Sequence, residues 1–338
     1  MSSWRRSRRT TRNSIRVGAE PVGADAAGPA ASSLPDPGLR DALALRREPP
    51  GEPRRIGYLY ILPALAVYGA FVLYPLLETV WYSLYEWDGL SESTFIGLDN
   101  YRDVVTSDPL RSAYLHAFVL ILFYAVIPAC LALVLVGAIS RARVRGQAGF
   151  RTILFLPQVV PMVVVAVIWR MIYAPSDGSL NEFLGAIGLD SLQRAWLGDF
   201  TLALPAVGVV GTWVMSGLAL VLFIAGVQRI PQSLYDAARV DGAGPVREFF
   251  AVTLPNLRGE IAVALTLMTI AALRNFDLVY LTTQGGPGNS TSVPAFEVYN
   301  RAFQTSQVGS AAAIGFTLAL MIFAITFAIT RIAERERA

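Results

Sequence analysis

Six long apolar blocks constrain the fold of this 338-residue chain more than any other feature. They lie at about residues 57–83, 113–139, 150–173, 202–227, 260–283 and 309–331. Each reaches or approaches the roughly 20 residues that a helix needs to cross a bilayer. Charged residues make up 16% of the chain, whereas a soluble domain carries about 25%. The sequence therefore predicts an all-α membrane protein with six transmembrane helices.

The distribution of arginine predicts the orientation of these helices. Four segments hold eleven, four, four and three arginines, in the order 1–56, 140–151, 228–259 and 331–338. The alternate loops hold two, one and one, in the order 84–112, 174–201 and 284–308. Basic residues in short loops favour the cytoplasmic side of the membrane. We therefore expect both termini and the loop 228–259 to be cytoplasmic.

Several kinds of chemistry are excluded by residues that the chain lacks. It has no lysine, so it can hold neither a P-loop lysine nor a Schiff-base lysine. Its one histidine, His116, and its one cysteine, Cys130, both lie in the second apolar block, which excludes an intrachain disulfide and a Cys/His zinc cluster. His116 is open to two interpretations, a helix-packing residue or part of a proton relay. We expect no catalytic residue and no metal site.

The chain divides into a tail and a membrane domain. Residues 1–55 are rich in Arg, Ala, Gly and Pro, a composition typical of disorder. We expect this basic cytoplasmic tail to touch anionic lipid; nucleic-acid binding is the alternative, but no folded module supports it. The membrane domain spans 56–332. Within its third block Pro157 and Pro161 lie one helical turn apart, which predicts a kinked or interrupted helix.

The loop 228–259 carries charges and helix signals between two apolar blocks. Pro231 suits the first turn of a helix, because its missing N–H would be unpaired there. A narrow face with small residues at its centre follows: Leu234, Ala237, Ala238 and Asp241. Gly242 and Gly244-Pro245 predict the end of this helix, and Phe249 begins a second helical piece. The first helix of this loop is either a binding site for another protein or an ordinary interfacial helix.

The motif in this loop resembles a known family. It runs Tyr235-Asp236-Ala237-Ala238, three residues, Gly242-Ala243 and finally Thr253-Leu254-Pro255. This pattern is similar to the EAA loop of binding-protein-dependent ABC importer permeases, with Asp236 where the family usually has Glu. Three other stretches resemble the carbohydrate, maltose-permease-like branch: 95–101, 275–280 and 285–291. The last two are more similar to the first permease of a two-permease system.

The resemblance covers residues 56–332 and implies a type I ABC importer permease in a bacterial plasma membrane. It implies a cytoplasmic coupling helix between helices 4 and 5 that docks on an ABC ATPase dimer. The implied coupling residues are Tyr235, Asp236, Ala237, Ala238, Asp241, Gly242, Ala243, Phe249 and Pro255. Further implied partners are a second homologous permease, an extracytoplasmic solute-binding protein and a sugar. The chain would be non-catalytic and hold no cofactor, since the ATPase would bind ATP and Mg.

Polar groups inside apolar spans are candidates for the substrate path. In the fifth block Asn275 and Asp277 offer hydrogen bonds to sugar hydroxyls, and Phe276 or Tyr280 offers a ring to stack on a sugar. The alternative is a structural Arg274–Asp277 ion pair at i, i+3. In the fourth block the weaker candidates are Trp213 and Ser216, because an aromatic residue there also suits helix packing.

One alternative function comes from another class of transporter. An ion-coupled secondary transporter of small polar solutes also needs several transmembrane helices. Such a carrier depends on paired carboxylates inside the membrane. Only Asp277 qualifies as one, so the chain offers no such pair. It also gives no account of the motif spacing at 235–255.

Overall fold

The computed structural model describes residues 54–139 and 147–335. The predicted tail at 1–55 therefore lies almost entirely outside the described residues. The described chain divides into two units. The first ends at Ala64 and contributes the beginning of the first helix, and the second begins at Leu65 and holds all the other elements.

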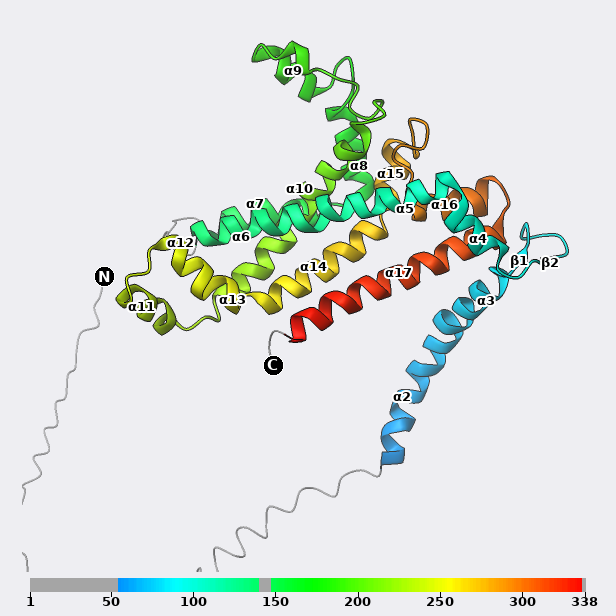
Figure 1. The fold of residues 1–338 in the computed structure, drawn as a ribbon, viewed down its shortest axis with the longest axis horizontal. Helices are drawn as coiled ribbons and strands as arrows, with labels where there is room; N and C mark the ends of the chain where they lie inside the picture. The colour runs from blue at the N-terminus through cyan, green and yellow to red at the C-terminus, as the bar shows by residue number, and fades with distance from the viewer. Residues whose placement is uncertain (1–53, 140–146, 336–338) are drawn as a thin grey trace, which may run out of the picture. The chain divides into compact units, whose positions relative to one another are not determined.

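The chain is helical along most of its described length (Figure 1). The first half contains α2 (Arg54–Tyr68), η1 (Gly69–Leu73), α3 (Tyr74–Tyr82), β1 (Tyr85–Glu86), β2 (Thr94–Phe95), α4 (Asp99–Thr106), α5 (Asp108–Ile121), η2 (Leu122–Val126), α6 (Ile127–Ile139), α7 (Gln147–Val159) and α8 (Met162–Ile172). The second half contains α9 (Ser179–Ala186), η3 (Asp190–Leu192), α10 (Ala203–Val227), α11 (Gln232–Val240), α12 (Pro245–Glu248), η4 (Phe249–Thr253), α13 (Leu254–Asn256), α14 (Arg258–Leu273), α15 (Asp277–Thr282), α16 (Pro294–Tyr299), η5 (Asn300–Gln304) and α17 (Val308–Arg335).

The expectation of a helical membrane protein is confirmed. Four helical segments of the described chain are long and apolar enough to cross a membrane: Tyr60–Tyr82, Asp108–Ala138, Ala203–Val227 and Val308–Glu334. Two bent helix pairs add a span each if each pair is counted as one. The predicted number of six is reached only with that count.

The predicted break in the third block is present. Helix α7 ends at Val159 and α8 begins at Met162, and the two axes differ by 105°. Pro161 lacks an N–H, and its ring disfavours helical geometry at the residue before it. The break therefore falls at the second proline, while Pro157 lies inside α7.

The fifth block contains a break that its apolar composition did not predict. Helix α14 ends at Leu273 and α15 begins at Asp277. The Asn275 N–H donates to the Ala272 carbonyl at 3.2 Å, three residues back, so the α-helical ladder closes in a tight turn. Three non-helical residues, 274–276, thus lie inside the expected span 260–283.

Helix α10 lies at the centre of the packing. It packs against α6, α7 and α14, and α14 in turn packs along α17 (Figure 1). Glycines on α10 allow the close approach: a Cβ on Gly211 would lie 1.9 Å from the Tyr124 ring, and one on Gly217 would lie 2.3 Å from the Leu154 carbonyl oxygen. The core around it includes the fully buried Phe223 and Met268.

The segments between α3 and α5 form a small folded cap that the sequence did not predict. Strands β1 and β2 pair antiparallel, with Tyr85 opposite Phe95. The buried Asn100 of α4 donates its amide to the carbonyls of Ser83 at 2.9 Å and Tyr85 at 3.0 Å. The N–H of Gly309 donates to the backbone carbonyl of Trp87 at 3.1 Å, so the cap is hydrogen-bonded to the first turn of α17.

Candidate functional site

The loop after α10 folds into two short helical pieces joined by a tight turn, as its sequence predicts, but the second piece begins at Pro245 rather than at Phe249, because proline suits the first turn of a helix. Helix α11 follows Pro231, and Gly242 adopts φ +74°, which an L side chain rarely tolerates. The Gly242 and Ala243 N–H groups donate to carbonyls of α11, at 3.0 and 2.9 Å. These bonds satisfy the last carbonyls of α11, so the turn is well defined.

Side-chain bonds hold the two pieces together. The buried Tyr235 places its hydroxyl 3.2 Å from Thr253 Oγ1. Arg239 Nε donates to Glu248 Oε2 at 3.3 Å, and the Glu248 side chain is only 9% exposed. Tyr235 was predicted from the motif, whereas the roles of Thr253, Arg239 and Glu248 were not; the nine-residue spacing of the two charges is their only signal in the sequence. The pair of pieces is therefore one internally bonded unit.

The other predicted coupling residues of α11 and its turn are distributed around this unit. Asp236, Ala237, Asp241 and Gly242 are exposed, and Ala238 and Ala243 are half-buried. The Asp236 carboxylate is already engaged, since it accepts from Arg239 at 3.3 Å and from Gln232 at 3.4 Å. An exposed ion pair of this kind contributes little stability, so Asp236 can exchange its partner.

The second piece faces the end of α6. Phe249 is half-buried, and a Cβ on Gly137 would lie 3.1 Å from its ring. Pro255 is half-buried in α13. Two apolar side chains of the first piece remain exposed, Leu234 at 42% and Val240 at 87%. Beside the unit lies a pocket of about 550 Å³ whose lining includes Gln232, Tyr235, Arg239 and Glu248.

The break between α14 and α15 interrupts the fifth block at residues that carry polar side chains. Asn275 is buried, with 6% of its surface exposed, and its Nδ2 has no hydrogen-bond partner among the described residues. Asp277 is exposed in the first turn of α15. The described residues include no ion pair between Arg274 and Asp277, so the structural alternative for these two charges has no support. An unpartnered buried amide costs free energy unless a ligand or water satisfies it.

Aromatic rings surround this break. The ring centroids of Phe276 and Tyr280 lie 5.2 Å apart with nearly parallel planes. Tyr299, from α16, contacts both rings, at 5.2 and 5.0 Å. Tyr299 was missed in the sequence analysis; its only signal was its spacing from Phe303, four residues on. The structure therefore brings four of the predicted path residues, 275–277 and 280, to one place and adds Tyr299 as a fifth residue and a third aromatic ring.

The two candidates on α10 make their ring and hydrogen-bond contacts with other residues. Trp213 packs edge-on against Trp169 of α8 at 5.7 Å, and Ser216 donates to the Trp213 carbonyl at 2.9 Å. Helix α8 packs on α15, where Arg170 donates to the Leu281 carbonyl at 3.3 Å. Trp213 thus contacts α8, which packs on α15, and its own helix α10 also packs against α14 and α15.

His116 lies at a packing contact between two segments. Its Nδ1 is 2.9 Å from the Ser292 carbonyl oxygen, which joins α5 to the loop before α16. The Ser292 hydroxyl in turn donates to the buried Glu297 at 2.5 Å. The contact to a backbone carbonyl agrees with the helix-packing interpretation of His116.

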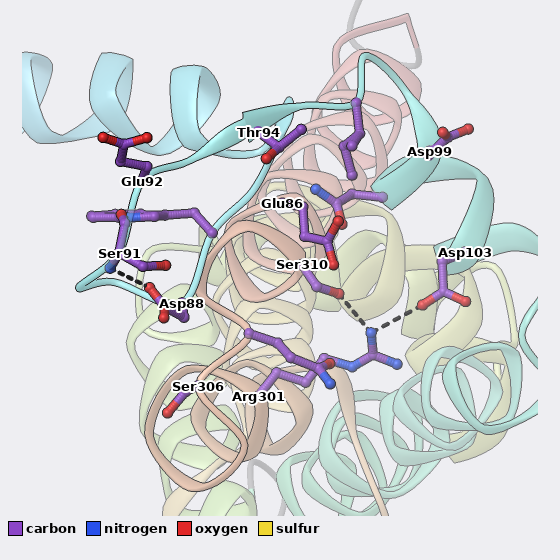
Figure 2. Close-up of a pocket in the computed structure, with 14 residues that line it drawn as sticks. Glu86, Asp88, Ser91, Glu92, Thr94, Asp99, Asp103, Arg301, Ser306 and Ser310 are labelled. Atoms are coloured by element: carbon purple, nitrogen blue, oxygen red, sulfur yellow. Dashed lines mark hydrogen bonds and ion pairs between the residues drawn. The ribbon is translucent and has the colours of Figure 1, made fainter.

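An acidic pocket of about 680 Å³ lies between the cap and the start of α17 (Figure 2). Its lining includes five carboxylates, from Glu86, Asp88, Glu92, Asp99 and Asp103. Figure 2 shows the Arg301 guanidinium between Asp103 and Ser310, at 2.9 and 2.6 Å. The backbone N–H groups of Ser91 and Leu90 donate to Asp88 and hold the pKa of its carboxyl below the usual range.

A multi-pass helical bundle with a folded helical pair between its fourth and fifth apolar segments defines a class, the membrane permeases. The sequence pattern of the family "Binding-protein-dependent transport system inner membrane component" matches residues 133–338. The chain belongs to this family.

Named relatives agree with this assignment. The chain is 39% identical to a probable ABC transporter permease, YurN of Bacillus subtilis, over 80% of this chain and 93% of that one. It is 34% identical to the diacetylchitobiose uptake permease NgcF of Streptomyces coelicolor, over 89% and 90%. A crystal structure of a bacterial ABC transporter for alginate import has the same fold, with a TM-score of 0.70 and 23% identity over 88% of this chain and 99% of that one.

Proposed function

We propose that this chain is one permease subunit of an ATP-driven, binding-protein-dependent sugar importer. It would pair with a second permease, an ABC ATPase dimer and an extracytoplasmic solute-binding protein. Both termini and the α11–α13 segment would face the cytoplasm, in agreement with the arginine distribution. Sugar would pass by alternating access through a site at the interface of the two permeases.

The bonded unit formed by α11 and the following helical piece is the observation that carries this proposal. A lever that converts ATPase closure into movement of the spans has to be rigid. Two side-chain contacts, Tyr235–Thr253 and Arg239–Glu248, join its two pieces. Small residues on α11 allow a partner backbone to approach, and exposed Leu234 and Val240 offer it apolar surface. A movement of α11 would thus be passed through α13 to α14.

The energy for transport would come from another chain. With no lysine in its sequence, this subunit cannot build a P-loop, so ATP and Mg would be bound by the ATPase. A sugar as cargo is supported by the chemistry at the α14–α15 break. There an unpartnered amide, a carboxylate and aromatic rings lie together, and one relative is named for the uptake of diacetylchitobiose. An ion-coupled carrier has no comparable support.

The test begins with the intact complex. An affinity tag on this chain should co-purify the ATPase and the second permease, which mass spectrometry identifies. The complex is reconstituted in vesicles with the binding protein, and uptake of radiolabelled diacetylchitobiose and maltose is measured with and without ATP. Gly242→Pro is compared with wild type, because proline cannot adopt φ +74° and lacks the N–H that donates to Arg239.

Loss of ATP-dependent uptake and of ATPase retention in Gly242→Pro, with both permeases still assembled, would support the proposal. Uptake that follows a proton or sodium gradient without ATP would contradict it. Uptake that is unchanged in Gly242→Pro would contradict the role assigned to α11. Gly244→Ala serves as the control, since Gly244 lies in the same turn with an ordinary φ of −72°.

A further inference from the structure

Four aromatic rings form a continuous series from an exposed position to the α14–α15 break. We call it the aromatic ladder: Phe303, Tyr299, Tyr280 and Phe276. Adjacent ring centroids lie 5.4, 5.0 and 5.2 Å apart along that order. Phe303 is 75% exposed and the other three rings are half-buried. Tyr299 also lies 5.2 Å from Phe276, so the three half-buried rings form one cluster with Phe303 at its exposed edge.

The ladder joins segments that are distant in sequence. Phe276 and Tyr280 belong to the fifth block, whereas Tyr299 and Phe303 belong to α16 and η5. A packing core would bury such rings, yet none of the four is buried in the described chain. Each ring therefore keeps free surface for a further contact.

Polar groups accompany the rings. The hydroxyls of Tyr280 and Tyr299 lie 3.4 Å apart, and the exposed Gln304 amide is 3.4 Å from the Tyr299 hydroxyl. Asn275 directly precedes Phe276 in the chain, and its Nδ2 has no hydrogen-bond partner among the described residues. Rings that offer an apolar face next to hydroxyl and amide groups suit a ligand with C–H faces and hydroxyl edges, which is the surface of a sugar ring.

The exposed end of the ladder lies on the predicted outer side. The segment α16–η5 precedes α17, and the loop 284–308 that contains it is one of the arginine-poor loops. A sugar released from a binding protein would thus meet the exposed Phe303 before the three half-buried rings.

We propose that the aromatic ladder is a sugar-binding entry track that conducts a saccharide from the outer surface to the α14–α15 break. This rests on the proposed function. Tyr299 and Phe303 are binding residues that the sequence analysis did not find. A longer oligosaccharide occupies several rings at once, so the contribution of the outer rings increases with the length of the sugar.

The test uses the tagged complex in vesicles with its binding protein. Concentration-dependent ATP-driven uptake is measured for maltose and maltotetraose and for diacetylchitobiose and tetraacetylchitotetraose. The variants are Phe303→Ala, Tyr299→Ala, Tyr299→Phe and Phe303→Trp. Phe183→Ala is the matched control, because Phe183 is 59% exposed on α9 and lies outside the ladder. Gel filtration and ATPase activity report assembly for every variant.

Loss of a ring contact of this kind corresponds to about a two- to tenfold rise in the apparent KM. We expect that rise in Phe303→Ala and Tyr299→Ala, larger for the tetrasaccharide than for the disaccharide. Phe303→Trp should retain wild-type uptake, as should Phe183→Ala. Tyr299→Phe keeps the ring, so its apparent KM should rise less than that of Tyr299→Ala.

Three results would overturn the inference. In the first, the wild type imports one of the four sugars, but Phe303→Ala and Tyr299→Ala have the same apparent KM as Phe183→Ala for the disaccharide and the tetrasaccharide. The aromatic ladder is then no entry track, and the proposed function stands. If the two alanine variants disrupt the assembly with the second permease, the exposed rings form a subunit interface instead. If the wild type imports none of these sugars, the proposed sugar function fails and the ladder falls with it.

Discussion

Arg239 Nε lies 3.3 Å from Glu248 Oε2 and so joins α11 to α12 across the turn at Gly242. Glu248 is almost buried, whereas the Arg239 side chain is 53% exposed. A buried carboxylate whose cationic partner is removed remains desolvated, and the free-energy cost of that desolvation is then no longer offset. The contact therefore makes the two helical pieces depend on each other, since each alone is only about two to three turns long.

Removal of the cation should loosen this unit. Arg239→Ala should destabilise the subunit by about 1–2 kcal/mol, a value reduced because Arg239 is half exposed and screened. It should lower ATP-dependent uptake by a larger factor than Arg247→Ala, which removes an exposed charge from the same segment. Thermal unfolding in detergent and vesicle uptake measure the two effects. Equal effects of the two alanine variants would contradict the role given to this contact.

The turn at Gly242 should tolerate asparagine better than alanine. Open space surrounds the Gly242 Cα among the described residues, so only its φ of +74° opposes a side chain. Gly242→Ala should cost about 1 kcal/mol, and Gly242→Asn less, since Asn enters the left-handed region more readily. Gly244→Ala is the matched control with open space and an ordinary φ. A loss of stability in Gly244→Ala equal to that in Gly242→Ala would rule out the backbone explanation.

Close packing of α10 should make Gly211 intolerant of any side chain. A Cβ there would lie 1.9 Å from the ring of Tyr124, which is fully buried and cannot swing into solvent. Gly211→Ala should destabilise the bundle by about 1–3 kcal/mol through overpacking. Gly69→Ala is the control, because a Cβ at Gly69 meets nothing within 4 Å in the described chain. Recovery of stability in the double variant Gly211→Ala/Tyr124→Leu would confirm the steric cause; an unchanged loss would exclude it.

The carboxyl of Asp199 should make the start of α10 sensitive to acid. It accepts hydrogen bonds from the Thr201 hydroxyl and the Thr201 and Leu202 N–H groups, which lower its pKa. A lowered folded-state pKa contributes stability above the unfolded value of about 3.9, and this contribution is lost as the pH falls through the folded pKa. Asp199→Ala should therefore melt at a lower temperature than wild type at pH 7.

The difference in melting temperature between Asp199→Ala and wild type should become smaller only when the pH falls below about 4. Asp199→Asn is the control, because its amide oxygen accepts the same bonds without titrating. Melting curves in detergent between pH 3 and pH 8 measure this difference. A difference that stays constant over the whole range would show that the carboxylate charge contributes nothing at this turn.

The sequence alone determined the helical class, the positions of most spans and the helix-turn-helix character of the loop after α10. Long apolar blocks permit few structures in a bilayer, because every backbone polar group there must be paired within a helix or barrel. Proline and glycine act locally, so Pro161 and Gly242 predicted a break and a turn at their own positions. The predicted ATPase-coupling role of α11 remains a prediction.

Only the tertiary structure decided which side chains meet. The break at 274–276, the contact of Tyr299 with Phe276 and the Arg239–Glu248 pair depend on packing between segments that are separated along the chain. Apolar composition and helical periodicity describe one element at a time. Long-range contacts carry no such local signal, because many residue types fill the same space in a helix interface. The sequence thus determined the elements, and packing decided the sites.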